Sequence, residues 1–177
     1  MCAEKSPGSR LAAVGRRLHR WLTPQRNPGG TVYGILVVGS LLAAEGSTAI
    51  SLIALMGAVL VALGLYWLAH GYAHMLGRRL DSDTRWSLSE LLTILRHEWA
   101  IVRGAFVPVA VLGAAGLAGA DVSTAVTAAL GSCALTLVVL EVVAGLDEEL
   151  SAVELALEVC VGATIGLGLF GLRILLH

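Results

Sequence analysis

Charged residues and closely spaced cysteines are scarce in this sequence, and these shortages limit what the protein can be. Only 14% of the 177 residues are charged and 56% are hydrophobic, whereas soluble domains carry about 25% charged residues. The net charge of −1 leaves no basic field that would attract a nucleic acid. Cys2, Cys133 and Cys160 form no CxxC metal or redox site. The composition excludes a soluble enzyme, a disordered chain and a nucleic-acid-binding domain.

The signatures of common catalytic and transport sites are also missing. The sequence contains no P-loop, no GxSxG elbow, no kinase signature and no DxxxD prenyl-diphosphate motif. The K⁺-channel filter sequence is absent as well. His97-Glu98 does not extend into an HExxH zinc motif, because residue 101 is Ile. A function therefore has to be inferred from individual polar residues.

Long apolar blocks dominate what is present, and they give the chain a mean hydropathy of +0.81. Most of these blocks are long enough for a membrane helix. The block at 77–103 carries five arginines and should not span. Within it, the capping box Ser87-Leu-Ser-Glu90 predicts a short interfacial helix near 88–99. The fold class predicted is an all-α bundle of about five transmembrane helices, at 28–44, 49–75, 104–118, 121–145 and 151–176.

Residues 1–27 differ from the rest of the chain, since they are basic and amphipathic. They predict a cytoplasmic helix lying on an anionic membrane surface, or alternatively a basic segment that only fixes orientation. Residues 28–177 are predicted to form one transmembrane domain. Six Lys and Arg residues precede the first span and five lie in the 77–103 block, while the turns at 45–48 and 119–123 have none. This asymmetry predicts a cytoplasmic N-terminus.

Four ionisable residues fall inside or near the predicted spans, at a similar depth. They are His70, His74, Glu141 and Glu158. A charged group in hydrocarbon costs roughly 3 kcal/mol or more, so such groups face the bundle interior and find partners. We expect these four to form one polar cluster in the inner leaflet. Two imidazoles and a glutamate could also hold a divalent metal ion.

Structural roles are the alternative for each of these residues. Glu141 and Glu158 could form ion pairs with Arg103 or Arg78. His74 is close to the interface and could extend toward water, and His70 could bond to a neighbouring helix. Glu154 belongs to a second capping box, Ser151-Ala-Val-Glu154, and is expected to be structural.

Glycines mark two faces on which helices are expected to pack. Gly162 and Gly166 form a GxxxG step on the same face as Glu158. Gly57, Gly64 and Gly71 recur at heptad spacing in the second span. Because small residues let helix backbones approach closely, these faces also predict self-association into a homo-oligomer.

Three short segments carry a resemblance to known proteins. Val32-Tyr-Gly-Ile-Leu, Tyr66-Trp-Leu-Ala-His-Gly-Tyr-Ala-His and Leu95-Arg-His-Glu-Trp resemble segments of small actinobacterial multi-spanning membrane proteins that have no assigned activity. The resemblance covers roughly residues 28–176. It implies a bacterial plasma membrane and carries over no catalytic residue.

Three functions are compatible with these patterns. The first is translocation of a proton or cation through a path that includes the His/Glu cluster. The second is a membrane-embedded enzyme that acts on a lipid or isoprenoid, with the same groups as acid, base or metal ligands. The third is an accessory protein whose acids only form ion pairs. The small polar residues of the opposite leaflet are few, which argues against a continuous path across the bilayer.

Overall fold

The computed structural model describes residues 27–45, 51–81, 87–147 and 151–176, and within these ranges all regular elements are helices. Five segments of this described part are long and apolar enough to cross a membrane, with α4 and α5 counted as one. The predicted all-α membrane fold is confirmed. The predicted N-terminal amphipathic helix lies outside the described residues. The helices are α2 (Pro28–Glu45), α3 (Leu52–Asp81), α4 (Leu88–His97), α5 (Trp99–Leu117), α6 (Val122–Asp147) and α7 (Ala152–Leu176).

Helix boundaries around the arginine-rich block differ from the prediction. The second span continues as α3 to Asp81, and the third begins at Trp99, with Glu98 as the single residue between α4 and α5. Arg78 and Arg79 lie in the last turn of α3, where positive charge favours the helix. Arg78 also pairs with Glu90 of α4, with 3.7 Å between Nη2 and Oε1. Arg78 and Arg79 therefore belong to the end of α3, and most of the block at 77–103 is helical.

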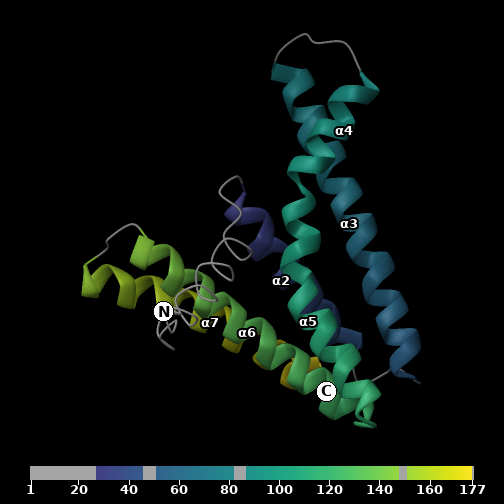
Figure 1. Ribbon diagram of the computed structural model, residues 1–177, viewed down its shortest axis with the longest axis vertical. Helices are drawn as coiled ribbons and strands as arrows, with labels where there is room; N and C mark the ends of the chain where they lie inside the picture. The colour runs from purple at the N-terminus through teal and green to yellow at the C-terminus, as the bar shows by residue number, and fades with distance from the viewer. Residues whose placement is uncertain (1–26, 46–50, 82–86, 148–150, 177) are drawn as a thin grey trace, which may run out of the picture.

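The helices form two groups joined by α2. In Figure 1, α3, α4 and α5 form an upright group, and α6 and α7 lie side by side at an oblique angle to it. α2 lies between the groups and contacts α5, α6 and α7 as well as α3. Its side chains Ile35, Val38 and Leu42 are fully buried in the core, together with Leu112 of α5 and Leu130 of α6.

Two glycines bring the backbones of α2 and α5 into direct contact. Gly34 of α2 lies on the backbone carbonyl of Ile101, and Gly104 of α5 lies on that of Thr31. A Cβ atom at either glycine would overlap the opposing backbone. Such close approach is how small residues hold membrane helices together, since apolar side chains gain little by leaving lipid. The α2–α5 pair thereby forms the centre of the bundle.

The starts of α2 and α5 lie at one level of the bundle. α2 has 18 residues and α5 has 19, and 1.5 Å per residue makes each about 27–29 Å long, close to the ~30 Å hydrocarbon core. Asn27, directly before α2, bonds to Glu98, directly before α5. Trp67 and Trp99 meet beside this level, with ring centroids 5.5 Å apart, and tryptophans favour membrane–water interfaces.

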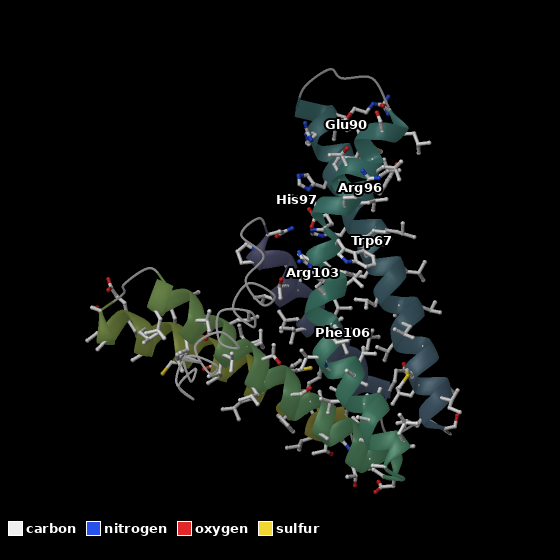
Figure 2. The ribbon with its side chains drawn as sticks, in the orientation of Figure 1. Trp67, Glu90, Arg96, His97, Arg103 and Phe106 are labelled. Atoms are coloured by element: carbon white, nitrogen blue, oxygen red, sulfur yellow. The ribbon has the colours of Figure 1, made fainter. Side chains whose placement is uncertain are left out.

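Beyond this level, the end of α3 and the whole of α4 project from the bundle as an arm (Figure 1). We call residues 71–81 and 88–97 the α3–α4 arm. Figure 2 shows Glu90 and Arg96 on it, away from the apolar core. Gly71 of α3 receives the side chain of Leu95, and the Trp67 indole N–H donates to the Leu95 carbonyl at 3.0 Å. These contacts hold α4 against α3.

Candidate functional site

Glu98 is a buried acid at the junction between α4 and α5. Only 3% of its side chain is exposed. Its backbone, with φ −76° and ψ 1°, ends α4 and begins α5. The N–H of Glu98 donates to the carbonyl of Ile94, and its own carbonyl accepts from Ile101. The junction thus keeps its backbone hydrogen bonds while the side chain turns toward α2 and α3.

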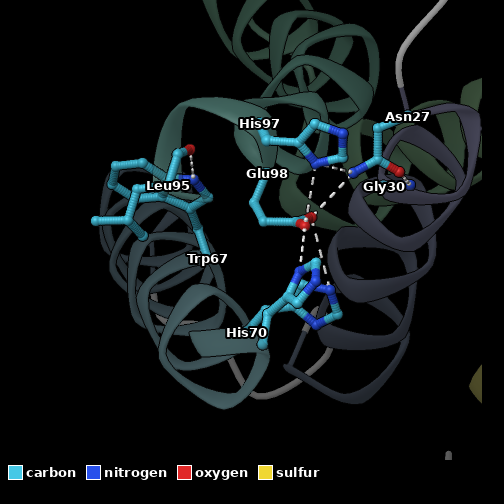
Figure 3. A network of polar contacts seen from close by, with 8 residues as sticks. Asn27, Gly30, Trp67, His70, Leu95, His97 and Glu98 are labelled. Carbon is cyan, nitrogen blue, oxygen red and sulfur yellow. Dashed lines mark hydrogen bonds and ion pairs between the residues drawn. The ribbon is translucent and has the colours of Figure 1, made fainter. Parts of the chain in front are cut away.

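Four side chains from three parts of the chain surround the Glu98 carboxylate (Figure 3). Asn27 Nδ2 donates to Oε2 at 3.0 Å. His74 Nδ1 lies 3.1 Å from Oε1, and His97 Nδ1 lies 3.4 Å from the same oxygen. His70 Nε2 lies 3.6 Å from Oε2. We refer to these five residues as the Glu98 cluster.

The three imidazoles of the cluster are partly open to the surroundings. Their side chains are 36% exposed for His70, 47% for His74 and 45% for His97, against 3% for Glu98. His70 also stacks on Tyr66, with an interplanar angle of 18° and ring centroids 5.9 Å apart. The cluster therefore combines a buried acid with three partly exposed imidazoles.

Local sequence explains how these side chains reach one point. Asn27 caps α2 by accepting the Gly30 N–H at 2.8 Å through Oδ1, which leaves its Nδ2 free to donate to Glu98. His70 and His74 are four residues apart and share one face of α3. His97 immediately precedes Glu98 at the end of α4. The cluster consequently ties α2, α3 and the α4–α5 junction together.

Glu141 and Glu158 occupy a second place in the fold. Glu141 Oε2 accepts the backbone N–H of Gly162 at 3.1 Å, and Glu158 is close enough to interact with it electrostatically. Both glutamates line a cavity of about 370 Å³ between α2, α6 and α7. Gly166, one turn after Gly162, lies against Ala134 of α6.

The four residues expected to cluster are thus distributed over two groups. His70 and His74 contact Glu98, while Glu141 and Glu158 lie together at the cavity. α2 contacts the elements of both groups. That the four act as one functional unit stays a prediction.

The alternative structural partners were partly right. Glu154 forms the expected capping box with Ser151, its carboxylate accepting both the Ser151 N–H at 2.9 Å and the hydroxyl at 2.6 Å. Arg78, one of the cations considered for Glu141 and Glu158, pairs with Glu90. α4 begins at Leu88 as the Ser87–Glu90 pattern predicts, but the Ser87 side chain makes no capping bond.

The predicted glycine stripe of α3 is mostly without neighbours in the structure. A Cβ at Gly57 or Gly64 would have no described atom within 4 Å, whereas one at Gly71 would meet Leu95. Packing at Gly57 and Gly64, and the homo-oligomer it would form, stays a prediction.

Sequence reasoning missed Glu98, Asn27 and His97 as site residues. His97-Glu98 was considered as part of a zinc motif, and both residues were placed in the short interfacial helix near 88–99, away from the expected polar cluster. The signal that could have found Glu98 is its position, because it immediately precedes the apolar run that begins at Trp99. An acid at such a boundary lies where interfacial histidines can reach it.

A metal ion finds no ready site in the ranges that the structure describes, since no three His, Cys, Asp or Glu side chains are arranged to hold one. No protein-family model, no curated protein and no solved structure matches the chain. The resemblance to small actinobacterial membrane proteins therefore rests on the three quoted segments alone. What stands is a multi-spanning helical membrane protein with a buried acid in contact with histidines.

Proposed function

We propose that the protein moves protons or another cation across the membrane and that the Glu98 cluster is the site where protons are loaded. The observation that supports this proposal is the buried Glu98 carboxylate, contacted by three half-exposed imidazoles. Histidine is the side chain whose charge ordinarily changes between about pH 5 and 8. Protons from the water at this membrane surface can therefore be bound beside a fixed acid.

Burial makes the charge of Glu98 depend on its neighbours. An ionised carboxylate held away from water costs several kcal/mol unless it is paired and hydrogen-bonded. Asn27 supplies a neutral N–H donor, and an imidazole supplies positive charge only when it is protonated. Each proton that His70, His74 or His97 gains converts a neutral contact with Glu98 into an ion pair. Proton binding therefore changes the contacts that Glu98 makes with α2 and α3 at the α4–α5 junction.

The transport test uses the purified protein in liposomes that contain a trapped pH-sensitive dye. After an external pH step, wild-type liposomes should change internal pH faster than empty ones. Glu98→Gln should lower this proton flux at least tenfold, because the amide keeps the shape of the carboxylate and removes its charge. Parallel measurements under K⁺ and Na⁺ gradients would identify another cation.

Glu90→Gln is the matched control for this test. It makes the same chemical change on α4, where the carboxylate pairs with Arg78 outside the cluster, and flux should stay at the wild-type rate. A folded Glu98→Gln protein with wild-type flux would overturn the proposed loading site.

A pH-responsive accessory role is the second candidate, and the apolar core favours it. Ile35, Val38 and Leu112 are completely buried, with 0% of each residue exposed. The centre of the bundle is therefore apolar and a poor path for protons. In this case, wild-type liposomes show no flux. The Trp67–Trp99 contact still responds to pH. The fluorescence of these two tryptophans, measured in a variant that lacks Trp21 and Trp86, changes between about pH 5 and 8. Glu98→Gln should remove that change.

A further inference from the structure

The cavity between α2, α6 and α7 has the composition of a ligand site. Its volume is about 370 Å³, within the range of about 300–1,000 Å³ that is usual for small-molecule sites. Val32, Leu140 and Val161 contribute apolar walls, and Glu141, Glu158 and Thr31 contribute polar groups. This mixture of an apolar surface with a few polar groups fits a molecule with one polar end.

Gly162 fixes the position of one carboxylate. The Glu141 carboxyl group lies directly on Gly162 and accepts its backbone N–H at 3.1 Å. A Cβ at residue 162 would overlap the carboxyl carbon and oxygens. The glycine thus provides the space in which Glu141 is held at the cavity beside α7.

The hydroxyl of Thr31 gives an independent indication that this cavity binds a ligand. Thr31 is 5% exposed, lines the cavity, and its hydroxyl oxygen has no hydrogen-bond partner among the described residues. Other helix threonines donate to the carbonyl four residues earlier: Thr93, Thr127, Thr136 and Thr164 do so at 2.6–2.8 Å. A buried hydroxyl without a partner is costly, so a ligand that bonds to it would be favoured.

We propose that this cavity binds a lipophilic amine, a primary ammonium group on an apolar body, with Glu141, Glu158 and Thr31 around the ammonium. A primary ammonium has three N–H donors, and these three side chains offer three acceptors. Its positive charge complements the two carboxylates, and its apolar body matches the walls. A hydrated divalent cation fits less well, because Ca²⁺ takes six to eight oxygen ligands and Mg²⁺ keeps several waters.

The acids also select among amines that a membrane contains. A phosphatidylethanolamine headgroup carries an ammonium but also a phosphate, which the two carboxylates would repel. A free alkylamine carries the ammonium alone. The ligand proposed is therefore a phosphate-free amine that enters from the bilayer, and the proposal is independent of proton loading at Glu98.

The test uses the full-length protein in nanodiscs of phosphatidylcholine and phosphatidylglycerol, with n-octylamine as the probe. Octylamine should raise the Tm of the wild-type protein in a saturable manner, and neutral n-octanol of the same chain length should not. Thr31→Val and Glu141→Gln should each weaken the apparent affinity for octylamine at least tenfold. Thr31→Val removes an unpaired hydroxyl at nearly constant volume, so the variant is expected to remain folded.

Glu154→Gln is the matched control, since Glu154 lies one turn before Glu158 on α7 and bonds to Ser151. Its octylamine affinity should equal that of the wild type. Equal affinities of wild type, Thr31→Val and Glu141→Gln would show that the amine acts through the lipid or another site, and would overturn the proposal. Competition by phosphatidylethanolamine added to the nanodiscs would overturn the choice of a phosphate-free amine.

Discussion

Asn27 makes two bonds whose loss can be measured separately. Its Oδ1 caps α2 through the Gly30 N–H, and its Nδ2 donates to the buried Glu98 carboxylate. Loss of a helix cap costs about 0.5–2 kcal/mol, and a hydrogen bond to a charged group contributes about 1.5–3 kcal/mol. Asn27→Ala should therefore lower the free energy of unfolding by about 2–5 kcal/mol, the two ranges taken together.

Asn27→Asp separates the two contributions, because aspartate still caps α2 but offers Glu98 an acceptor and a negative charge. Reversible unfolding of the purified protein in mixed micelles of dodecylmaltoside and SDS gives the free energies. Combining each variant with Glu98→Gln completes a double-mutant cycle, which should show a coupling of about 1–3 kcal/mol between residues 27 and 98. A loss no larger than a cap alone for Asn27→Ala, together with wild-type stability for Asn27→Asp, would refute a stabilising bond to Glu98.

Further predictions concern packing, capping and topology. Gly104→Ala should destabilise the protein by about 1–3 kcal/mol in the same assay, because the new Cβ overlaps the Thr31 backbone. Gly64→Ala should instead stabilise α3 by about 0.5–1 kcal/mol, because a Cβ at residue 64 meets no described atom within 4 Å. If α3 instead packs between copies of the chain, Gly64→Leu should dissociate an oligomer seen by native electrophoresis. Hydrogen bonds from Thr124 hold the pKa of Asp121 below its usual value. The stabilisation that Asp121 gives α6 as its cap is therefore present above about pH 4 and lost as pH falls further. The difference in unfolding free energy between wild type and Asp121→Ala should shrink in acid. Reporter fusions should place the N-terminus in the cytoplasm and the C-terminus on the other side.

Sequence patterns predicted the parts of this fold that depend on neighbours along the chain. Apolar blocks located the five membrane segments, and the Ser151–Glu154 box located the start of α7. The block at 77–103 was less predictable, since its arginines indicated a segment that does not span and whose only helix lies near 88–99. Arg78 and Arg79 instead end α3, and Glu90 of α4 pairs with Arg78 across the turn. Hydropathy measures the mean of a window and does not detect such pairing between helices.

The candidate site was harder to predict, because depth along a helix does not say which neighbour a side chain faces. His70 and His74 were singled out as polar residues near the end of a span, but the acid that they contact is Glu98. Glu98 is 24 residues from His74 and 71 from Asn27 in sequence. The close approach of α2 and α5 at Gly34 and Gly104 brings Asn27 to Glu98. Gly34 belongs to the step Gly30-Thr-Val-Tyr-Gly34, which the sequence interpretation did not use.

The first turn of α2 relates the two polar regions to each other. Asn27 faces Glu98, and Thr31, one turn later on the same helix, lines the cavity that holds Glu141 and Glu158. Residues four apart on a helix are about 6 Å apart along its axis, so a displacement of the start of α2 would act on both regions. Charge at the Glu98 cluster pulls on Asn27, while an occupant of the cavity would hold Thr31. If His70, Glu141 and Glu158 act as one unit, the first turn of α2 is therefore the element through which they would do so.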